Sequence, residues 1–274
     1  MKTWLITGAS SGLGLTMARK LLTRGDRVAA SARRTDALAG LAEQYRDRLR
    51  IARFDVTDTP ALRREVDAAF GDLGRIDVIV SNAAYGLFGA GEEINDAQID
   101  RQIATNLVGS IQLIRSVLPH LRAQGGGRII QVSSEGGQVA YPNFSLYHAS
   151  KWGIEGFVEA VAQEVVSFGI DFIIVEPGPV KTGFAAGLDH AAPLDVYDAT
   201  PAGDMRRAIA SGGFVINGDA ERTVDAMIAA ADADRGVPRL ALGRRAFENI
   251  EKALTGRLAV LRANRAVAYS VDLS

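Results

Sequence analysis

The chain has 274 residues, of which 47% are hydrophobic and 23% are charged. This size and balance favour one globular domain and exclude a disordered or collagen-like chain. The 31 Lys and Arg residues almost balance the 32 Asp and Glu residues, so no strong positive field would attract nucleic acid or an anionic membrane. We therefore expect the partner to be a small molecule.

Cysteine is absent from the sequence, which excludes disulfides, thiolate zinc sites and a cysteine nucleophile. The three histidines are too scattered for a local metal motif, so we expect no metal site. No segment is apolar over the roughly 18 residues of a membrane span, and the apolar run at the N-terminus is too short for a signal peptide. We expect a cytoplasmic protein.

Apolar segments of strand length alternate with longer segments of helical period up to about residue 175. Their nearly continuous apolar composition indicates parallel strands buried on both faces. The pattern predicts an α/β fold in which a doubly wound parallel sheet of about seven strands carries helices on both faces, within a single domain spanning residues 1–274. Strands are expected at residues 3–7, 27–32, 49–54, 76–81, 128–133, 171–175 and 239–242.

Helices are predicted from apolar residues that recur every three or four positions. The most regular stripe predicts one long helix that ends near Pro119, and it consists of Ile99, Ile103, Leu107, Ile111, Ile114 and Leu118. Further helices are expected at residues 57–70, 144–168 and 219–232, and from about residue 244 onward.

The segment at residues 178–218 is rich in Gly, Ala, Pro and Asp and contains no strand pattern. We interpret it as an insertion or lid rather than a linker to a second domain. Its apolar residues, which are Phe184, Leu188, Tyr197, Met205, Phe214 and Ile216, either cover an apolar substrate or pack a loop or a subunit contact.

A glycine-rich turn joins the first predicted strand to the first helix. Residues 7–14 read Thr-Gly-Ala-Ser-Ser-Gly-Leu-Gly, and glycine lets a backbone turn sharply and approach a pyrophosphate at the helix N-terminus. Between two strands of a parallel sheet this pattern favours dinucleotide binding over an empty tight turn. The residues expected to contact the cofactor are Gly8, Ser10, Ser11, Gly12, Leu13 and Gly14.

Two arginines at the end of the second predicted strand favour NADP over NAD. Ala32 offers no acceptor for a ribose hydroxyl, whereas Arg33 and Arg34 supply guanidinium donors for a 2′-phosphate. The alternative is a pair of solvated arginines in a loop.

Tyr147 and Lys151 are four residues apart in a predicted helix, so they share one helix face. We expect the Lys151 ammonium to lower the pKa of the Tyr147 phenol and make it a proton donor and acceptor near neutral pH. Taken alone, such a pair would be an ordinary amphipathic surface pair.

With further motifs in the same order, the chain resembles the compact, single-domain short-chain dehydrogenases/reductases. The motifs are the glycine turn, Asn82-Ala83-Ala84, a serine after the fifth strand, Tyr147-x-x-x-Lys151 and Pro177-Gly178. The resemblance covers residues 1–182 closely. It implies a Rossmann-type fold and hydride transfer between a nicotinamide cofactor and a carbonyl or secondary alcohol. Together with the two arginines and the apolar residues of the 178–218 segment, it predicts NADP as the cofactor and a small, apolar substrate.

The same resemblance assigns roles to individual residues. Ser134 would hold the substrate oxygen, with Ser133 as its competitor, and Asn106 would bend its helix and hold a water, although a purely structural role is equally compatible. Ala84 stands where the family usually has glycine. The remaining cofactor contacts implied are Asp55, Val56, Asn82, Ala83, Ala84, Tyr147, Lys151, Pro177, Gly178, Val180 and Thr182.

Two other classes of protein remain as alternatives. One is a non-catalytic, nucleotide-sensing regulator with this fold, and the other is a longer epimerase or dehydratase that shares Tyr-x-x-x-Lys. We also expect a homodimer or homotetramer. Its contact would use Trp152, Phe157, Val161 and Val165, unless these residues face the sheet.

Overall fold

The computed structural model describes residues 1–234 and 237–273. Its main sheet has seven parallel strands in the order β3-β2-β1-β4-β6-β7-β9. Their bounds are β1 Thr3–Thr7, β2 Arg27–Ala32, β3 Leu49–Arg53, β4 Val78–Ser81, β6 Gly127–Val132, β7 Ile170–Pro177 and β9 Arg239–Leu242. The predicted fold class is confirmed.

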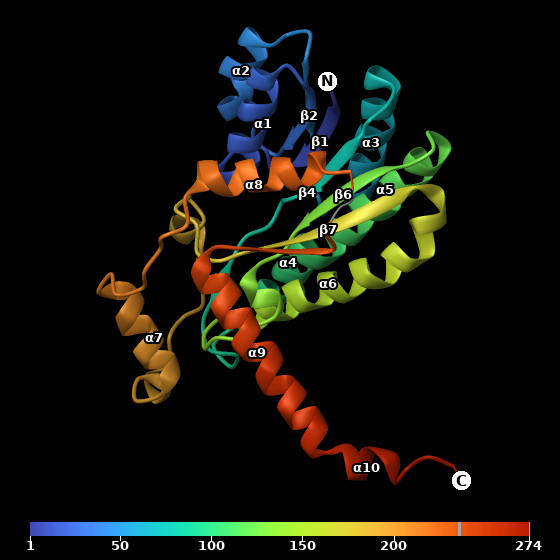
Figure 1. Cartoon of the computed structure of the whole chain (residues 1–274). Helices are drawn as coiled ribbons and strands as arrows, with labels where there is room; N and C mark the ends of the chain where they lie inside the picture. Colours follow the sequence, from blue (N-terminus) through green and yellow to red (C-terminus); the bar gives the residue numbers. More distant parts are fainter. Residues whose placement is uncertain (235–236, 274) are drawn as a thin grey trace.

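Helices cover both faces of this sheet because successive strand residues point to opposite sides. On β1, Trp4 and Ile6 enter one core and Leu5 enters the other. The first core packs against α1 (Gly12–Arg24), α2 (Ala39–Gln44) and α8 (Ala220–Asp232), and the second against α3 (Thr59–Leu73), α5 (Gly109–Ala123) and α6 (Ser145–Val165) (Figure 1).

The chain order reverses between β1 and β4, since β2 and β3 lie on one side of β1 and the later strands on the other. The loops after β1 and β4 therefore diverge around a crevice at the carboxyl edge. Ligands of open α/β sheets bind at such a reversal.

The predicted long helix across residues 99–118 is confirmed, but it contains a π-helical turn and ends later than expected. The structure has α4 (Asp96–Ile103), a π-helical turn (Ala104–Val108) and then α5, which contains Pro119. The helix continues past the proline because Leu121, in its next turn, is fully buried in the core. The free energy gained by packing Leu121 outweighs the cost of the backbone hydrogen bond that Pro119 cannot donate.

The expectation that residues 178–218 contain no strand is also wrong. Strand β8 (Asp189–His190) pairs in parallel with β5 (Leu87–Phe88). The close approach needs glycine, since a Cβ on Gly86 would lie 2.4 Å from Leu188 Cδ2 and one on Gly89 would lie 2.5 Å from Ala191 Cβ. A strand of only two residues is too short to produce a periodic hydrophobic pattern in the sequence.

Most of the apolar residues of α6 proposed for a subunit contact face the sheet instead. Val161 and Val165 are buried, and Phe157 packs against the same core. Trp152 alone of the four is exposed, at 44%.

Helix α7 (Pro201–Ala210) and the C-terminal part of α9 (Arg244–Ala263) lie away from the two faces of the main sheet (Figure 1). Helix α7 lies within the 178–218 segment, and α9 starts beside the sheet and runs outward into α10 (Arg265–Tyr269). Among the described residues, no helix has both the length and the apolar character needed to cross a membrane.

Candidate active site

The glycine turn between β1 and α1 has no room for a Cβ at Gly8 or Gly14. A Cβ on Gly14 would lie 2.5 Å from the carbonyl oxygen of Gly8, and one on Gly8 would lie 2.9 Å from Ala83 Cα. Gly8 and Gly12 also have φ values of 67° and 53°, which favour glycine. The turn thus leads directly into the first amides of α1, where an anion is stabilised by the helix dipole.

Other residues of this turn surround the same helix start. Ser11 is the N-cap residue, and within the described part of the chain its side chain forms no capping hydrogen bond. Ser11 is exposed and Ser10 half-buried, whereas Leu13 packs against the core. The two serine hydroxyls are therefore available beside the amides.

Asn82 holds the glycine turn from the neighbouring strand. Its Nδ2 donates to the carbonyl oxygens of Thr7 at 2.9 Å and Gly8 at 3.3 Å. The amides of Asn82 and Ala83 donate to Thr7 Oγ1 at 3.0 and 3.2 Å. Asn82 therefore connects the loop after β4 to the glycine turn. Ala84, which is half-buried, follows in the same loop.

Arg33 and Arg34 lie exposed after the carboxyl end of β2. The Arg33 guanidinium is 78% exposed and only 3.6 Å from the Asp55 carboxylate, which follows β3. Asp55 also accepts hydrogen bonds from the amide and hydroxyl of Thr57. Val56 packs close to Gly109, the first residue of α5, so residues 55 and 56 lie near the start of that helix.

Ser134, Tyr147 and Lys151 come together at the carboxyl end of β6. Ser134 follows the strand, and its hydroxyl interacts with the Tyr147 phenol while its Oγ accepts the Gly136 amide at 3.0 Å. Lys151 is buried, and its Nζ lies 5.7 Å from the centre of the Tyr147 ring. The ammonium donates to the carbonyl oxygen of Val132 at 2.9 Å.

The expected lowering of the tyrosine pKa is not found in this structure. Burial raises the pKa of Tyr147 to about 12, although the Ser134 hydroxyl acts in the opposite direction. Burial also lowers the pKa of Lys151 to about 8, against the attraction of Glu155. Because Lys151 binds a backbone carbonyl while both groups are desolvated, the loss of hydration outweighs the ammonium's effect on the phenol.

The two candidate serines have different surroundings. Ser133 is buried, and its hydroxyl donates a hydrogen bond to the Glu155 carboxylate. The same carboxylate accepts hydrogen bonds from Gln138 and Arg239. Ser134 is half-buried and faces Tyr147. The geometry therefore favours Ser134 over Ser133 as the hydroxyl that meets a substrate.

Asn106 lies in the π-helical turn, buried beneath the loop after β4. Its Nδ2 donates to the carbonyl oxygen of Tyr85 at 2.8 Å, and its Oδ1 accepts the Tyr85 amide at 3.1 Å. Nδ2 also reaches Ser150 Oγ at 3.3 Å. Asn106 thus links the loop after β4 to the helix that carries Tyr147 and Lys151.

The segment after β7 reaches the glycine turn. The Gly178 amide follows Pro177 and binds the Leu242 carbonyl at 3.0 Å, and Val180 forms a β-bridge with Gly218. A Cβ on Gly12 would lie 3.7 Å from Thr182 Cβ. The two ends of the 178–218 segment are therefore joined beside the expected pyrophosphate position.

Two phenylalanine rings pack against Tyr147. Phe184 packs edge-on against its ring at 5.8 Å between centroids, and Phe144 does so at 6.3 Å. Phe88 packs against Phe144 at 5.1 Å. By contrast, Phe214 packs under Arg245, and Tyr197 donates to Glu92, so these two expected lid residues make contacts elsewhere.

Sequence reasoning missed a carboxylate that fastens the 178–218 segment to the loop after β4. The Glu93 side chain is 1% exposed and accepts hydrogen bonds from the amides of Ala90 and Leu194 and from Arg206. Arg206 lies 113 residues from Glu93 in sequence. No local motif could have revealed this contact.

Comparisons with known proteins agree with this arrangement. The family model described as short chain dehydrogenase matches residues 2–192. An oxidoreductase, BOA17, of Botryotinia fuckeliana is 40% identical over 201 residues, which are 73% of each chain. A 3-ketodihydrosphingosine reductase of Bacteroides thetaiotaomicron is 37% identical over 180 residues, which are 66% of this chain and 64% of that one.

Solved structures show the same fold. A short-chain dehydrogenase from Streptomyces avermitilis has a TM-score of 0.91 and 33% identity, with 99% of this chain and 100% of that chain covered. ElxO with NADP bound has a TM-score of 0.73 and 23% identity over 88% of this chain and 96% of that chain. The present chain belongs to the short-chain dehydrogenase family of oxidoreductases.

Proposed function

We propose that the protein is an NADP-dependent oxidoreductase that reduces the carbonyl group of a small, apolar substrate or oxidises the corresponding secondary alcohol. The observation that carries this proposal is the convergence of Ser134, Tyr147 and Lys151 at the end of β6. Reduction of a carbonyl group needs a hydride carrier and, beside it, side chains that give a proton to the carbonyl oxygen.

The residues of the crevice fit a dinucleotide. The turn excludes any Cβ at Gly8 and Gly14, which leaves backbone amides to meet a pyrophosphate. Arg33 and Arg34 are exposed and would bind a 2′-phosphate, Arg33 in place of its long ion pair with Asp55. The same bound cofactor would lie against Asp55, Val56, Ala83, Ala84, Pro177, Val180 and Thr182.

Tyr147 would supply the proton in carbonyl reduction. When bound, the nicotinamide cofactor supplies or accepts the hydride. With a pKa near 12 the Tyr147 phenol is protonated at neutral pH, so it is ready to protonate a developing alkoxide. In the reverse reaction the same phenolic oxygen would accept the proton of the alcohol.

Ser134 and Lys151 would complete the site. The Ser134 hydroxyl, beside the phenol, would orient the carbonyl oxygen. Lys151, with a pKa of about 8 and one hydrogen bond to Val132, is mostly charged at pH 7 and retains further N–H donors for the nicotinamide ribose.

The substrate side favours an apolar ketone or aldehyde. Phe144 and Phe184 pack edge-on against Tyr147, and Phe88 packs against Phe144. Residues 178–218 would act as the lid that holds the substrate there. The relative named as a 3-ketodihydrosphingosine reductase supports a ketone as substrate class.

The test is turnover of the purified protein with NADPH or NADH and a series of aliphatic ketones and aldehydes of increasing chain length. We expect NADPH oxidation that accelerates with apolar chain length. Binding of NADPH without turnover of any carbonyl compound would instead support the nucleotide-sensing regulator.

A further inference from the structure

Asn143, four residues before Tyr147, combines a strained backbone with a buried side chain. Among the described non-glycine residues it alone has a positive φ, of 66°, and this left-handed conformation costs free energy for any residue with a Cβ. The residue is 3% exposed, and its Oδ1 has no hydrogen-bond partner within the described part of the chain. Strained and unsatisfied positions of this kind are concentrated at functional sites.

Three segments that are distant in sequence meet at Asn143. Its Nδ2 donates to the carbonyl oxygen of Ala202 in α7 at 2.8 Å. Its own carbonyl oxygen accepts the amide of Gly89, which follows β5, at 2.9 Å. The next residue, Phe144, is the N-cap residue of α6, and its ring packs edge-on against Tyr147. Asn143 therefore connects the 178–218 segment to the start of the helix that carries Tyr147.

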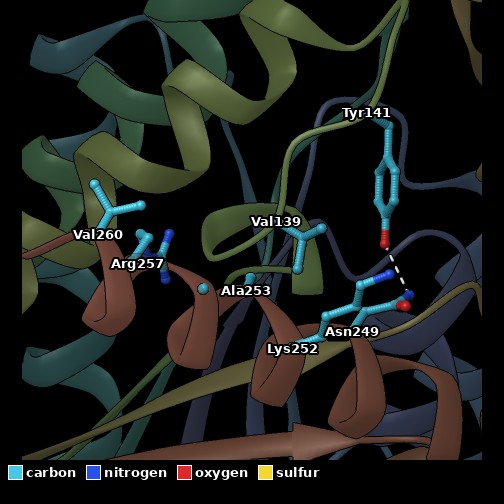
Figure 2. Close-up of a pocket in the computed structure, with 8 residues that line it drawn as sticks. Val139, Tyr141, Asn249, Lys252, Ala253, Arg257 and Val260 are labelled. Atoms are coloured by element: carbon cyan, nitrogen blue, oxygen red, sulfur yellow. Dashed lines mark hydrogen bonds between the residues drawn. The ribbon is translucent and has the colours of Figure 1, made fainter. Parts of the chain in front are cut away.

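The segment that bears Asn143 is held firmly from the other elements. Asn249 of α9 donates to the Tyr141 hydroxyl at 2.9 Å, as Figure 2 shows. The Tyr141 amide donates to Nε2 of the buried His148 in α6 at 3.0 Å. These hydrogen bonds attach residues 141–144 to α6 and α9, so Asn143 offers α7 a fixed point of attachment.

Helix α7, by contrast, has little packing of its own. Only Ala202 and Gly203 of this helix are buried, and the helix lies away from the faces of the main sheet (Figure 1). Among the described residues, it is hydrogen-bonded outside the 178–218 segment by Asn143 and by the 2.8 Å bond from Arg206 to Glu93. An element with few buried contacts opens at a low free energy, so these two hydrogen bonds decide how firmly α7 is docked.

The side chain of Asn143 provides something that glycine could not. Glycine would adopt the same backbone conformation without strain, so the turn alone gives no reason for a side chain at this position. The amide donor is what glycine lacks. Its orientation is determined by Ala202, because a reversed amide would place Oδ1 against another acceptor. The strain is therefore the cost of holding α7 through a side chain.

We propose that Asn143 is a positioning residue that docks helix α7 against the segment leading to Tyr147 and thereby holds the 178–218 segment closed over the substrate. Asn143 acts through α7 and does not touch the reacting atoms. The substrate role rests on the proposed function, whereas the docking of α7 is measured without turnover.

The first test is hydrogen–deuterium exchange of the α7 amides in Asn143→Gly, which keeps the backbone conformation and removes the donor. Exchange should accelerate roughly 2- to 10-fold, the effect of one neutral hydrogen bond on the opening equilibrium. Arg206→Met removes a charged donor and should accelerate it by about 10-fold or more. The amides of β1 should exchange as in the wild type in both variants.

Matched controls make the same changes at exposed positions outside the 178–218 segment. They are Asn264→Gly and Arg115→Met, and both should leave exchange in α7 unchanged. Wild-type exchange of α7 in Asn143→Gly would overturn the proposal. An equal acceleration in β1 would also overturn it, because that result would indicate a general loss of stability instead of the release of one helix.

The second test is steady-state kinetics of the double variant Asn143→Gly, Arg206→Met with NADPH and a ketone that the wild type reduces. KM for the ketone should rise at least about 3-fold, because molecules with α7 undocked do not hold the substrate. We expect kcat to stay within about 2-fold and the dissociation constant of NADPH to stay unchanged. A variant that had merely lost folded protein would instead show a lower kcat at the wild-type KM.

The two tests separate this inference from the proposed function. A double variant with faster exchange in α7 but the wild-type KM would overturn the substrate role of Asn143. A wild type that turns over no carbonyl compound would remove the proposed function and the substrate role with it. The exchange of Asn143→Gly would then still decide whether Asn143 docks α7.

Discussion

Asn106 clamps the backbone of Tyr85 through both ends of its amide, with Nδ2 on the carbonyl oxygen and Oδ1 on the amide nitrogen. Asn106→Ala removes both hydrogen bonds and leaves the Tyr85 amide without its partner, although Gln102 still donates to the Tyr85 carbonyl oxygen, and the loss should be about 1–3 kcal/mol of unfolding free energy. Urea denaturation measures this loss. Gln163→Ala, an exposed amide on α6, should change stability by less than about 0.5 kcal/mol, and equal losses would contradict the clamp.

Glu155 should influence the protonation of Lys151. Its buried carboxylate raises the pKa of Lys151 against the effect of burial, so Glu155→Gln should move the alkaline limb of the activity profile to lower pH. Glu159→Gln removes an exposed carboxylate from the same arginine, Arg239, and should leave that limb in place. Identical profiles for both variants would contradict this role.

Arg33 and Arg34 should decide the choice between the two cofactors. A charged hydrogen bond contributes about 1.5–3 kcal/mol, so the double change to Ala should weaken NADPH binding by roughly 10- to 150-fold and hardly affect NADH. Fluorescence titration measures both constants. Arg46→Ala, another exposed arginine, is the control, and an equal loss for NADPH and NADH would remove the NADP assignment.

His148 should make the fold less stable in mild acid. Burial lowers its pKa, although the Gly136 carbonyl bound by Nδ1 opposes this shift, and Nε2 accepts the Tyr141 amide in the neutral form. The unfolded chain therefore binds a proton first, and stability falls as pH decreases below about 6.5. The difference in urea midpoint between pH 7.5 and 5.5 should shrink in His148→Gln but persist in His190→Gln, an exposed position.

The strands could be predicted because buried parallel strands are apolar on both faces and need only local sequence. The Tyr147 and Lys151 pair could be predicted because four residues make about one helical turn. The roles of Glu93, Glu155 and Arg239 could not, since their partners lie in distant segments. The raised pKa of Tyr147 also depends on burial by residues far away in sequence, such as Phe184.

The central claim is that the Tyr147 phenol gives the proton in carbonyl reduction. The measurement is the steady-state rate of NADPH oxidation with a ketone that the wild type reduces, at pH 7, for Tyr147→Phe beside the half-buried control Tyr45→Phe. We predict a loss of about 10²- to 10⁴-fold in kcat for Tyr147→Phe, with NADPH affinity largely retained, and little change for Tyr45→Phe. A Tyr147→Phe enzyme with wild-type kcat would contradict the mechanism.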